Sequence, residues 1–373
     1  MIPLIVDLDT EWRGGQSQAL LLLKGLYERG HPAELLTAKG SALGRRARRV
    51  GIYVHEVSRG MLRLLAARDI HGLLSDRRIE LVHANEGHAL TAAWLAGAHR
   101  RVPLLSSRRI GFPLKRNWIS RARYRALASF IANSQNVAQS LIDGGFPAER
   151  IAIVNEGVEI PEIVSAAERS TARKEWGIAE DEFLFGCASA FVPEKGQRHI
   201  VEAFPAVLRQ FPKTRVLLAG EGKCLNEVRD LATRLILTET VLLPGFVTNM
   251  DKFYAALDAF VFPSEFEGLG TALQAAMAYG LPVISTTRGA LSEVVEDGRT
   301  ALVAEPHAKD FAATMIRLLS DQALQRRLGA AGRAEVIARF SVDRMVQSTL
   351  AVYEKTLGII SKRNGVVDQK HSL

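Results

Sequence analysis

The chain has 373 residues, more than one hydrophobic core usually supports, and this length predicts two domains of ordinary size. A hydrophobic content of 47% with 24% charged residues is typical of a folded globular protein and argues against a disordered chain. No apolar run reaches the 18 or so residues that span a bilayer, and the opening MIPLIVDLD lacks the basic segment of a secretory signal. The cysteines Cys187 and Cys224 have no metal-ligand spacing, so we expect buried thiols in a cytoplasmic protein.

The net charge of +8 is concentrated in the N-terminal half, where basic residues gather in three clusters. Such a surface attracts an anionic membrane leaflet, a phosphorylated acceptor or nucleic acid, although each cluster alone is also what a solvated face carries. Nucleic acid is the least favoured partner because no aromatic-interleaved RNA-binding strand or DNA-reading motif accompanies the charge. The clusters are Arg45, Arg46, Arg48 and Arg49; Arg100, Arg101, Arg108 and Arg109; and Lys115, Arg116, Arg121, Arg123 and Arg125.

The first half of the chain alternates strands and helices. A strand over residues 3–8, a turn at Gly14–Gly15, a helix over 16–29 and a strand over 33–37 form the start of a nucleotide-binding sheet. Because the turn lacks a full G-x-G-x-x-G, a dinucleotide-dependent dehydrogenase is disfavoured. The alternation continues with helices over 44–50, 61–74, 89–98 and 136–143 and strands over 79–83, 103–107, 128–133 and 151–154.

Polar residues follow several of these strands. Carboxyl ends of parallel strands line the ligand crevice of such a sheet, so residues at these ends are candidates to face an acceptor. A lone histidine is more often structural than catalytic, and two histidines flanking a glutamate leave both interpretations open. The acceptor-side candidates are His83, Glu86, His88, Arg108 and Arg109.

A polar, weakly periodic stretch over residues 160–171 predicts a linker, and the alternation restarts after it. Strands are expected over 183–188, 215–219, 241–243, 259–262 and 283–285, and helices over 197–211, 225–235, 250–256, 271–279, 308–320 and 343–357. We therefore predict an α/β protein with two Rossmann-like domains, at residues 1–165 and 166–345. Residues 346–373 should form a helix that packs back on the first domain, and a polar tail.

The segment VFPSEFEGLGTALQAAMAYGLPV, residues 261–283, is the strongest local signal. Its glycines precede a helix, and the unpaired N–H groups and positive dipole of a helix start suit a phosphate or diphosphate. Glu267 stands at the same turn, where a carboxylate fits only if it faces something else, such as sugar hydroxyls. A βα turn with an ordinary acidic residue is the alternative.

Together these pieces resemble family 4 of the glycosyltransferases, a retaining, nucleotide-sugar-dependent family with the GT-B fold of two Rossmann-like domains facing a central cleft. Each element is weak alone, but their order and spacing are specific and cover the chain up to about Gly358. The matching elements are WRGGQ at 12–16, Arg29–Gly30–His31, VPEKG at 192–196, Gly220–Glu221–Gly222, Gly245–Phe246–Val247, the block at 263–283, Glu293–Val294–Val295 and Asp297–Gly298.

The resemblance implies that the second domain binds a nucleotide-sugar as substrate and the first binds the acceptor. It implies that Lys195 reaches the donor diphosphate, that Glu267 holds sugar hydroxyls, and that His88 or His83 orients a hydroxyl. No metal is implied, since no Asp-x-Asp motif stands at a strand end. The donor-binding residues implied are Gly15, Phe246, Val247, Gly268, Leu269, Gly270 and Thr271.

Two residues depart from the family pattern. Ala190 stands where the family commonly has an arginine, five residues before Lys195, and Ala275 stands where a ribose-binding glutamate is common. The expected function is sugar transfer to a glycan or lipid-linked acceptor, such as a lipopolysaccharide-type glycan, with peripheral contact at the inner face of an anionic membrane. The alternative is a catalytically weakened paralogue that acts as a binding or partner subunit.

Overall fold

The computed structural model describes residues 1–58, 60–76, 78–111, 114 and 117–368. Lys115 and Arg116 of the third basic cluster lie outside the described residues. The chain forms two compact units: unit 1 contains residues up to Gly157 and from Val342 onward, and unit 2 contains Val158–Ser341. The first unit thus ends eight residues before the boundary expected at 165, and the chain returns to it four residues before 346.

Unit 1 is built on a seven-stranded parallel sheet with the order β3-β2-β1-β4-β5-β6-β7. Its strands are β1 (Pro3–Asp7), β2 (Glu34–Ala38), β3 (Tyr53–Val57), β4 (Leu81–Ala84), β5 (Leu104–Arg108), β6 (Ser129–Ala132) and β7 (Ile151–Ile153). Its helices are α1 (Gly14–Glu28), α2 (Ala42–Arg49), α3 (Leu62–Leu73), α4 (Gly87–Leu95), α5 (Trp118–Arg125), α6 (Gln135–Asp143) and α14 (Val342–Asp368).

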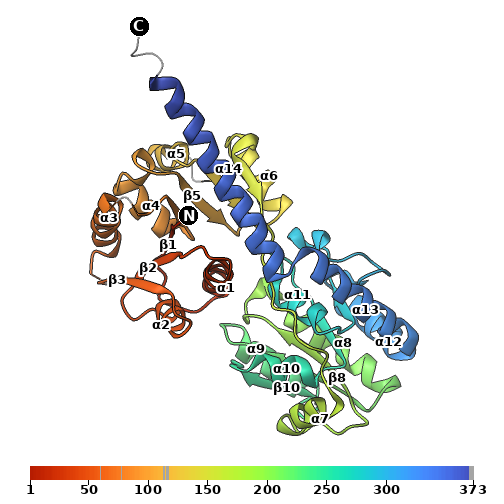
Figure 1. The fold of residues 1–373 in the computed structure, drawn as a ribbon. Coiled ribbons are helices and arrows are strands. Elements are labelled where there is room, and N and C mark those ends of the chain that lie inside the picture. Colours follow the sequence, from red (N-terminus) through yellow and green to blue (C-terminus); the bar gives the residue numbers. More distant parts are fainter. Residues whose placement is uncertain (59, 77, 112–113, 115–116, 369–373) are drawn as a thin grey trace. The chain divides into compact units, whose positions relative to one another are not determined.

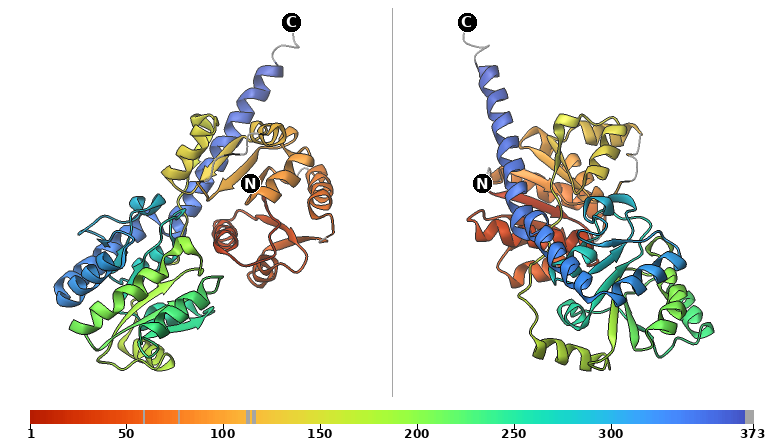
Figure 2. Two further views of the ribbon diagram at one scale, coloured as in Figure 1. Left: turned by 180° about the vertical axis from the view of Figure 1, so that it is seen from behind. Right: turned by 90° about the vertical axis from the view of Figure 1, so that its right-hand side faces the viewer.

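Alternation along the buried strands places apolar side chains on both faces of this sheet, as a parallel sheet requires. Leu4 and Val6 of β1 belong to the core under α3 and α4, whereas Ile5 belongs to the core under α1 and α14. Figure 1 and Figure 2 show α14 lying against unit 1, and its Tyr353 is fully buried there. The last helix is therefore part of the hydrophobic core of unit 1.

Unit 2 has a six-stranded parallel sheet with the order β10-β9-β8-β11-β12-β13, again covered by helices on both faces. Its strands are β8 (Phe183–Ala188), β9 (Thr214–Ala219), β10 (Val241–Gly245), β11 (Ala259–Phe262), β12 (Val283–Ser285) and β13 (Leu302–Val303). Its helices are α7 (Ala166–Glu175), α8 (Gln197–Gln210), α9 (Leu225–Arg234), α10 (Met250–Ala256), α11 (Thr271–Ala278), α12 (Ala308–Ser320) and α13 (Gln322–Arg339).

The prediction of a linker over 160–171 is wrong from Ala166 onward, where α7 begins. Ser165 and Glu168 form a capping box: the Ser165 hydroxyl accepts from the Glu168 N–H at 3.2 Å, and the Glu168 carboxylate accepts from the Ser165 N–H at 2.8 Å. The spacing S-x-x-E is a recognisable helix start that the polar composition of the stretch concealed. None of the described helices combines the length and apolar character that a membrane span requires.

Candidate functional site

The strand order of unit 2 reverses between β8 and β11, so the loops that follow these two strands open side by side at the carboxyl edge of the sheet. This is the place where open α/β sheets bind ligands. The loop after β8 carries Lys195, and the loop after β11 carries Glu267. Two segments that are far apart in sequence therefore meet where a donor site is expected.

Backbone contacts fasten these two loops together. The N–H of Glu265 donates to the carbonyl of Glu194 at 2.8 Å, and the Ser264 hydroxyl donates to the same carbonyl at 3.3 Å. Gly196 has φ of +66°, and a Cβ there would lie 2.4 Å from the carbonyl oxygen of Pro263. Only glycine permits this approach, so Gly196 fixes the loop that carries Lys195 against the loop that carries Glu267.

Lys195 and Glu267 form an ion pair, with the lysine Nζ donating to the glutamate Oε1. Both side chains are mostly buried, at 20% and 12% exposure, so the pair is less screened than one on the surface. A further glycine supports the acid: a Cβ on Gly289 would lie 2.6 Å from the carbonyl oxygen of Glu267. Sequence reasoning missed Gly289, since nothing in its neighbourhood marks a close backbone approach.

The start of α11 lies directly after Glu267. Its N-cap residue, Gly270, has no side chain that could bind the first N–H groups of the helix, which therefore stay open to an anion. Leu269 is buried at 1% exposure, so it can offer a ligand only its backbone, while Gly268 and Thr271 are half-buried. These residues can present N–H groups, as predicted for a diphosphate.

Phe246 and Val247 follow β10, the outermost strand on the β8 side of the sheet. The Phe246 side chain is 61% exposed, which is unusual for a phenylalanine, whereas Val247 packs partly against the core of unit 2. An exposed aromatic ring at a strand end can stack on a planar base, and it remains a candidate for that role.

The two departures from the family pattern lie beside the same loops. Ala190 is exposed, and its carbonyl accepts from the amide of Gln197 at 3.0 Å. Ala275 is half-buried on α11, one residue after Gln274, whose side chain points into the core and is fully buried. Gln274 therefore does not take the place of the missing glutamate.

Substituting Gln274 with leucine is expected to stabilise the protein. Neither the amide oxygen nor the amide nitrogen of Gln274 has a hydrogen-bond partner, and a buried unpaired polar group costs about 1–3 kcal/mol. Leucine has a similar volume and no polar atoms, so Gln274→Leu should raise the midpoint of thermal unfolding by several degrees. A lower midpoint in calorimetry, or a loss of nucleotide binding, would show that the amide is used.

In unit 1 the strand order reverses between β1 and β4, and a buried polar cluster lies there. Asp7, the last residue of β1, is fully buried and accepts from the amides of Asn85 at 2.6 Å and Gln16 at 3.0 Å. Asn85 also donates to the carbonyl of Gly15 at 3.1 Å. Burial raises the pKa of Asp7, although these hydrogen bonds oppose the shift. The cluster anchors the glycine turn, and sequence reasoning missed Asp7, Gln16 and Asn85.

Arg109 completes this cluster. Its guanidinium donates to the carbonyl of Asn85 at 2.9 Å and to the side-chain oxygen of Asn85 at 2.8 Å, and it pairs with Glu156 at 3.0 Å. A Cβ on Gly15 would lie 3.9 Å from the guanidinium, so both line the same edge. Arg108 ends β5 and is half-buried. Of the two predicted arginines, Arg109 is the one at the reversal point.

His83 is almost fully buried, beside a small cavity of about 30 Å³ that Arg108 and Arg109 also line. It is 2% exposed, and its ring nitrogens lie 2.6 Å from the Tyr353 hydroxyl and 2.7 Å from the Ser107 hydroxyl. Burial, together with the charge of Arg109, lowers the pKa of His83 to about 3, so the ring is neutral at physiological pH. His83 joins β4 to β5 and α14, and we interpret it as structural.

Glu86 and His88 differ in their exposure. Glu86 is the N-cap of α4: its carboxylate accepts from the N–H groups of His88 and, at 2.6 Å, of Ala89, and burial raises its pKa. Capping of α4 explains the position of the Glu86 side chain without any role in binding a sugar acceptor. The His88 side chain is exposed and lines a pocket with residues 8–10 and 61–64.

The described residues hold no group of three or more His, Cys, Asp or Glu side chains that could share a metal ion.

Two family models match the chain: glycosyltransferase family 4 over residues 12–161, and glycosyl transferases group 1 over residues 168–335. The chain is 31% identical over 200 residues to the GDP-mannose-dependent monoacylated alpha-(1-6)-phosphatidylinositol monomannoside mannosyltransferase of Corynebacterium glutamicum, covering 51% of this chain and 52% of that protein. It is 26% identical over 213 residues to the lipopolysaccharide core biosynthesis mannosyltransferase LpsB of Rhizobium meliloti, covering 55% and 61%. The matches span about half the length of the first of these relatives.

Solved structures resemble the whole chain. The Anabaena protein HepE, in complex with UDP and glucose, has a TM-score of 0.83 at 22% identity, covering 94% of this chain and 99% of that chain. A glycosyltransferase from Rickettsia africae has a TM-score of 0.86 at 19% identity, covering 95% and 98%. This likeness confirms the predicted fold of two Rossmann-like domains. Since one glycosyltransferase model matches most of unit 1 and another most of unit 2, the protein belongs to glycosyltransferase family 4 and has the GT-B fold.

Proposed function

We propose that this protein transfers a sugar from a nucleotide-sugar donor to an acceptor with retention of anomeric configuration. The observation that carries the proposal is the Lys195–Glu267 ion pair, held at the reversal point of the unit 2 sheet beside the open start of α11. The cation and the free helix N–H groups match the diphosphate of a sugar diphosphate, and the carboxylate matches its sugar hydroxyls.

The chemistry follows from these groups. The diphosphate takes Lys195 and the first N–H groups of α11, and the sugar hydroxyls donate to Glu267. As the bond between the anomeric carbon and the diphosphate oxygen breaks, Lys195 offsets the negative charge that develops on the leaving group. The acceptor oxygen bonds to the anomeric carbon on the same face, and its proton passes to the departing phosphate oxygen.

The donors of similar proteins support the proposal of a nucleotide-sugar donor. The Corynebacterium relative is GDP-mannose-dependent, and the Anabaena structure holds UDP and glucose. A panel of GDP- and UDP-sugars tests the function: release of nucleoside diphosphate with at least one donor is expected. No turnover and no binding with any of them would refute it.

We also propose that transfer needs no divalent cation, because Lys195 and the dipole of α11 can balance the charge of the diphosphate. The donor assay repeated in EDTA tests this directly. Equal rates with and without the chelator support the proposal, and a rate that is lost and then restored by added Mg²⁺ or Mn²⁺ contradicts it.

Substituting Ala275 with glutamate is expected to tighten binding of the nucleoside diphosphate by about ten- to a hundredfold. A charged hydrogen bond to the ribose contributes about 1.5–3 kcal/mol, and α11 already positions this residue half-buried at the site. Calorimetric titration of GDP and UDP measures the change. Ala275→Gln is the matched neutral control and should recover less, whereas unchanged affinity in Ala275→Glu would place the ribose elsewhere.

A catalytically weakened paralogue is the second candidate, and Ala190 is the observation that favours it. An exposed methyl group stands where relatives of this family commonly carry a guanidinium. Calorimetry on the unchanged protein separates the two: micromolar binding of a nucleoside diphosphate supports the enzyme, and no detectable binding supports a binding or partner subunit.

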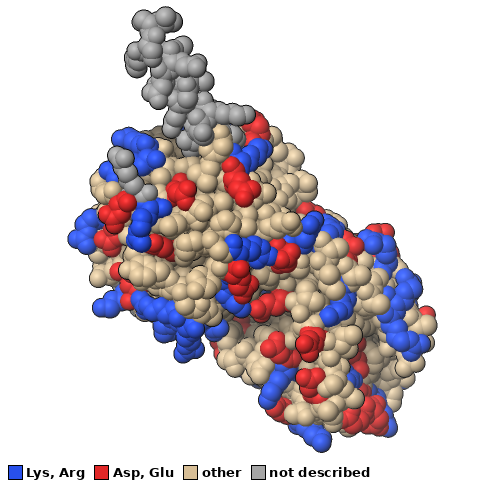
Figure 3. All heavy atoms as spheres, viewed as in Figure 1, with Lys and Arg blue, Asp and Glu red and all other residues tan. Residues whose placement is uncertain are grey.

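The acceptor is proposed to be a glycan or lipid-linked molecule reached at the inner face of an anionic membrane. Figure 3 shows lysine and arginine side chains gathered over α2, where Arg45, Arg46, Arg48 and Arg49 are exposed. The guanidinium of Arg46 stacks on Trp12 at 4.1 Å. Sedimentation with phosphatidylglycerol vesicles should exceed that with phosphatidylcholine vesicles and fall as salt rises.

A further inference from the structure

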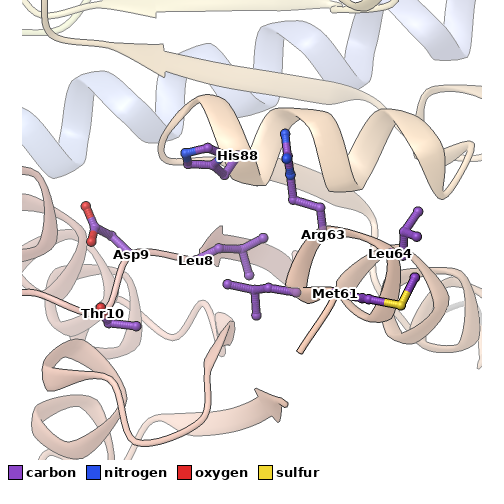
Figure 4. Close-up of a pocket in the computed structure, with 8 residues that line it drawn as sticks. Leu8, Asp9, Thr10, Met61, Arg63, Leu64 and His88 are labelled. Carbon is purple, nitrogen blue, oxygen red and sulfur yellow. The ribbon is translucent and has the colours of Figure 1, made fainter. Parts of the chain in front are cut away.

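Unit 1 contains an open pocket that the donor chemistry does not use. Its volume is about 580 Å³, within the usual range for small-molecule sites. Figure 4 shows the lining side chains. They are Leu8, Asp9, Thr10, Met61, Leu62, Arg63, Leu64 and His88.

The pocket lies where a ligand is expected. Leu8, Asp9 and Thr10 follow β1, and His88 follows β4, so the pocket opens at the point where the strand order of unit 1 reverses. Residues 61–64 join it from the start of α3. It therefore draws on three separate chain segments around one edge of the sheet.

Two apolar residues of this pocket are unusually exposed. Met61 is 72% and Leu64 52% exposed, although both are large hydrophobic side chains. Met61 also has φ of 47°, a left-handed conformation that costs a residue other than glycine about 1–2 kcal/mol. A strained, exposed methionine suits a surface that adapts to an apolar ligand.

The lining separates into a polar and an apolar end. In Figure 4, Asp9, Thr10 and His88 lie at one end, Met61 and Leu64 lie at the other, and Arg63 stands over the middle. Among the residues that the structure describes, no carboxylate pairs with Arg63, although the side chain is exposed beside the pocket. An amphiphile with an anionic group between its polar and apolar parts would match this order.

We infer that the pocket seats a lipid-linked acceptor, with its hydrocarbon chain over Met61 and Leu64 and its phosphate at Arg63. The acceptor hydroxyl then lies toward Asp9 and His88. This inference rests on the proposed glycosyl transfer, for which it names the acceptor class and the residues that select it.

Titration of the full-length protein with butyl, octyl and dodecyl phosphate tests the inference below the concentration at which these probes aggregate. Each buried methylene should tighten binding by up to about fourfold. Leu64→Ser and Met61→Asn should flatten this dependence on chain length; asparagine tolerates the left-handed conformation. Arg63→Gln should weaken the binding of all three probes by a similar factor of about ten, while affinity still rises with chain length.

Leu95→Ser is the matched control, since Leu95 is 47% exposed on α4 and does not line the pocket. It should bind the three probes as the unchanged protein does. Binding of GDP or UDP, measured on every variant, reports separately on folding and on the donor site. The inference is overturned if the protein binds the three chain lengths with equal affinity. It is also overturned if affinity still rises with chain length in Leu64→Ser, even where donor turnover is found. If affinity rises with chain length as expected but no donor is turned over, the proposed function is overturned instead.

Discussion

Glu267→Gln is expected to reduce sugar transfer by about a hundredfold or more while the protein stays folded and still binds nucleoside diphosphates. The close approach of Gly289 fixes the backbone of Glu267, and the ion pair with Lys195 holds its carboxylate. A neutral amide keeps the shape but loses the charge that sugar hydroxyls bind. Lys195, released from its partner, should meet the diphosphate at least as well as before.

Two measurements check this expectation: turnover of the donor identified in the panel, and calorimetric titration of the corresponding nucleoside diphosphate. Glu265→Gln is the matched control, because Glu265 lies on the same turn, 48% exposed, and contacts His199 at 3.2 Å. It should retain near-normal turnover. If Glu267→Gln remained active, or if it lost diphosphate binding, the assignment of Glu267 to the sugar would be wrong.

The sequence predicted the two loops of this site but not their contact. Lys195 and Glu267 were each placed by resemblance, and they are 72 positions apart. Their ion pair depends on the approach of Gly196 to Pro263, which is a property of the folded backbone. A motif names the loops that bear functional side chains, whereas the partner of each side chain in the free protein emerges only from the packing of the loops.

The same limit applies in unit 1. His83 and Arg109 both stand at strand ends, and sequence pattern treats them alike. The His83 ring forms a hydrogen bond with Tyr353, which is 270 positions away on α14. Arg109 instead donates to Asn85, and Asn85 donates to Asp7. Long-range hydrogen bonds of this kind leave no periodic signal, so position at a strand end cannot separate a structural histidine from one that faces a ligand.

The sequence predicted the strands that are continuous apolar runs. Among the elements it missed are β3 and α13, whose sequences lack a clear strand or helix pattern. β3 is an edge strand whose side chains are mostly half-buried, and it lacks the apolar run that marked its neighbours. α13 buries Leu324, Leu328 and Val336 at helical spacing, but Gly329 and Gly332 interrupt its sequence. Both elements depend on tertiary contacts more than on local preference.

Residues 166–171, assigned from the sequence to a linker, begin a helix that is fixed to the core of unit 2 through an arginine. Arg173 of α7 is fully buried and pairs with Asp258 at 3.0 Å. It also donates to the carbonyls of Ala256 at 3.1 Å, Ala179 at 2.6 Å and Glu182 at 2.5 Å. One guanidinium thus satisfies backbone groups from two segments, the turn before β8 and the end of α10.

Arg173→Ala is therefore expected to destabilise the protein by about 3–5 kcal/mol, because it leaves three backbone carbonyls without this donor and removes one of the arginines that pair with Asp258. Urea unfolding followed by circular dichroism measures the loss. Lys174→Ala, which removes an exposed cation from the neighbouring position of the same helix, should change the stability by less than about 0.5 kcal/mol. A loss below about 1 kcal/mol in Arg173→Ala would mean that water or Arg169, which also donates to Asp258 at 2.5 Å, replaces the missing guanidinium.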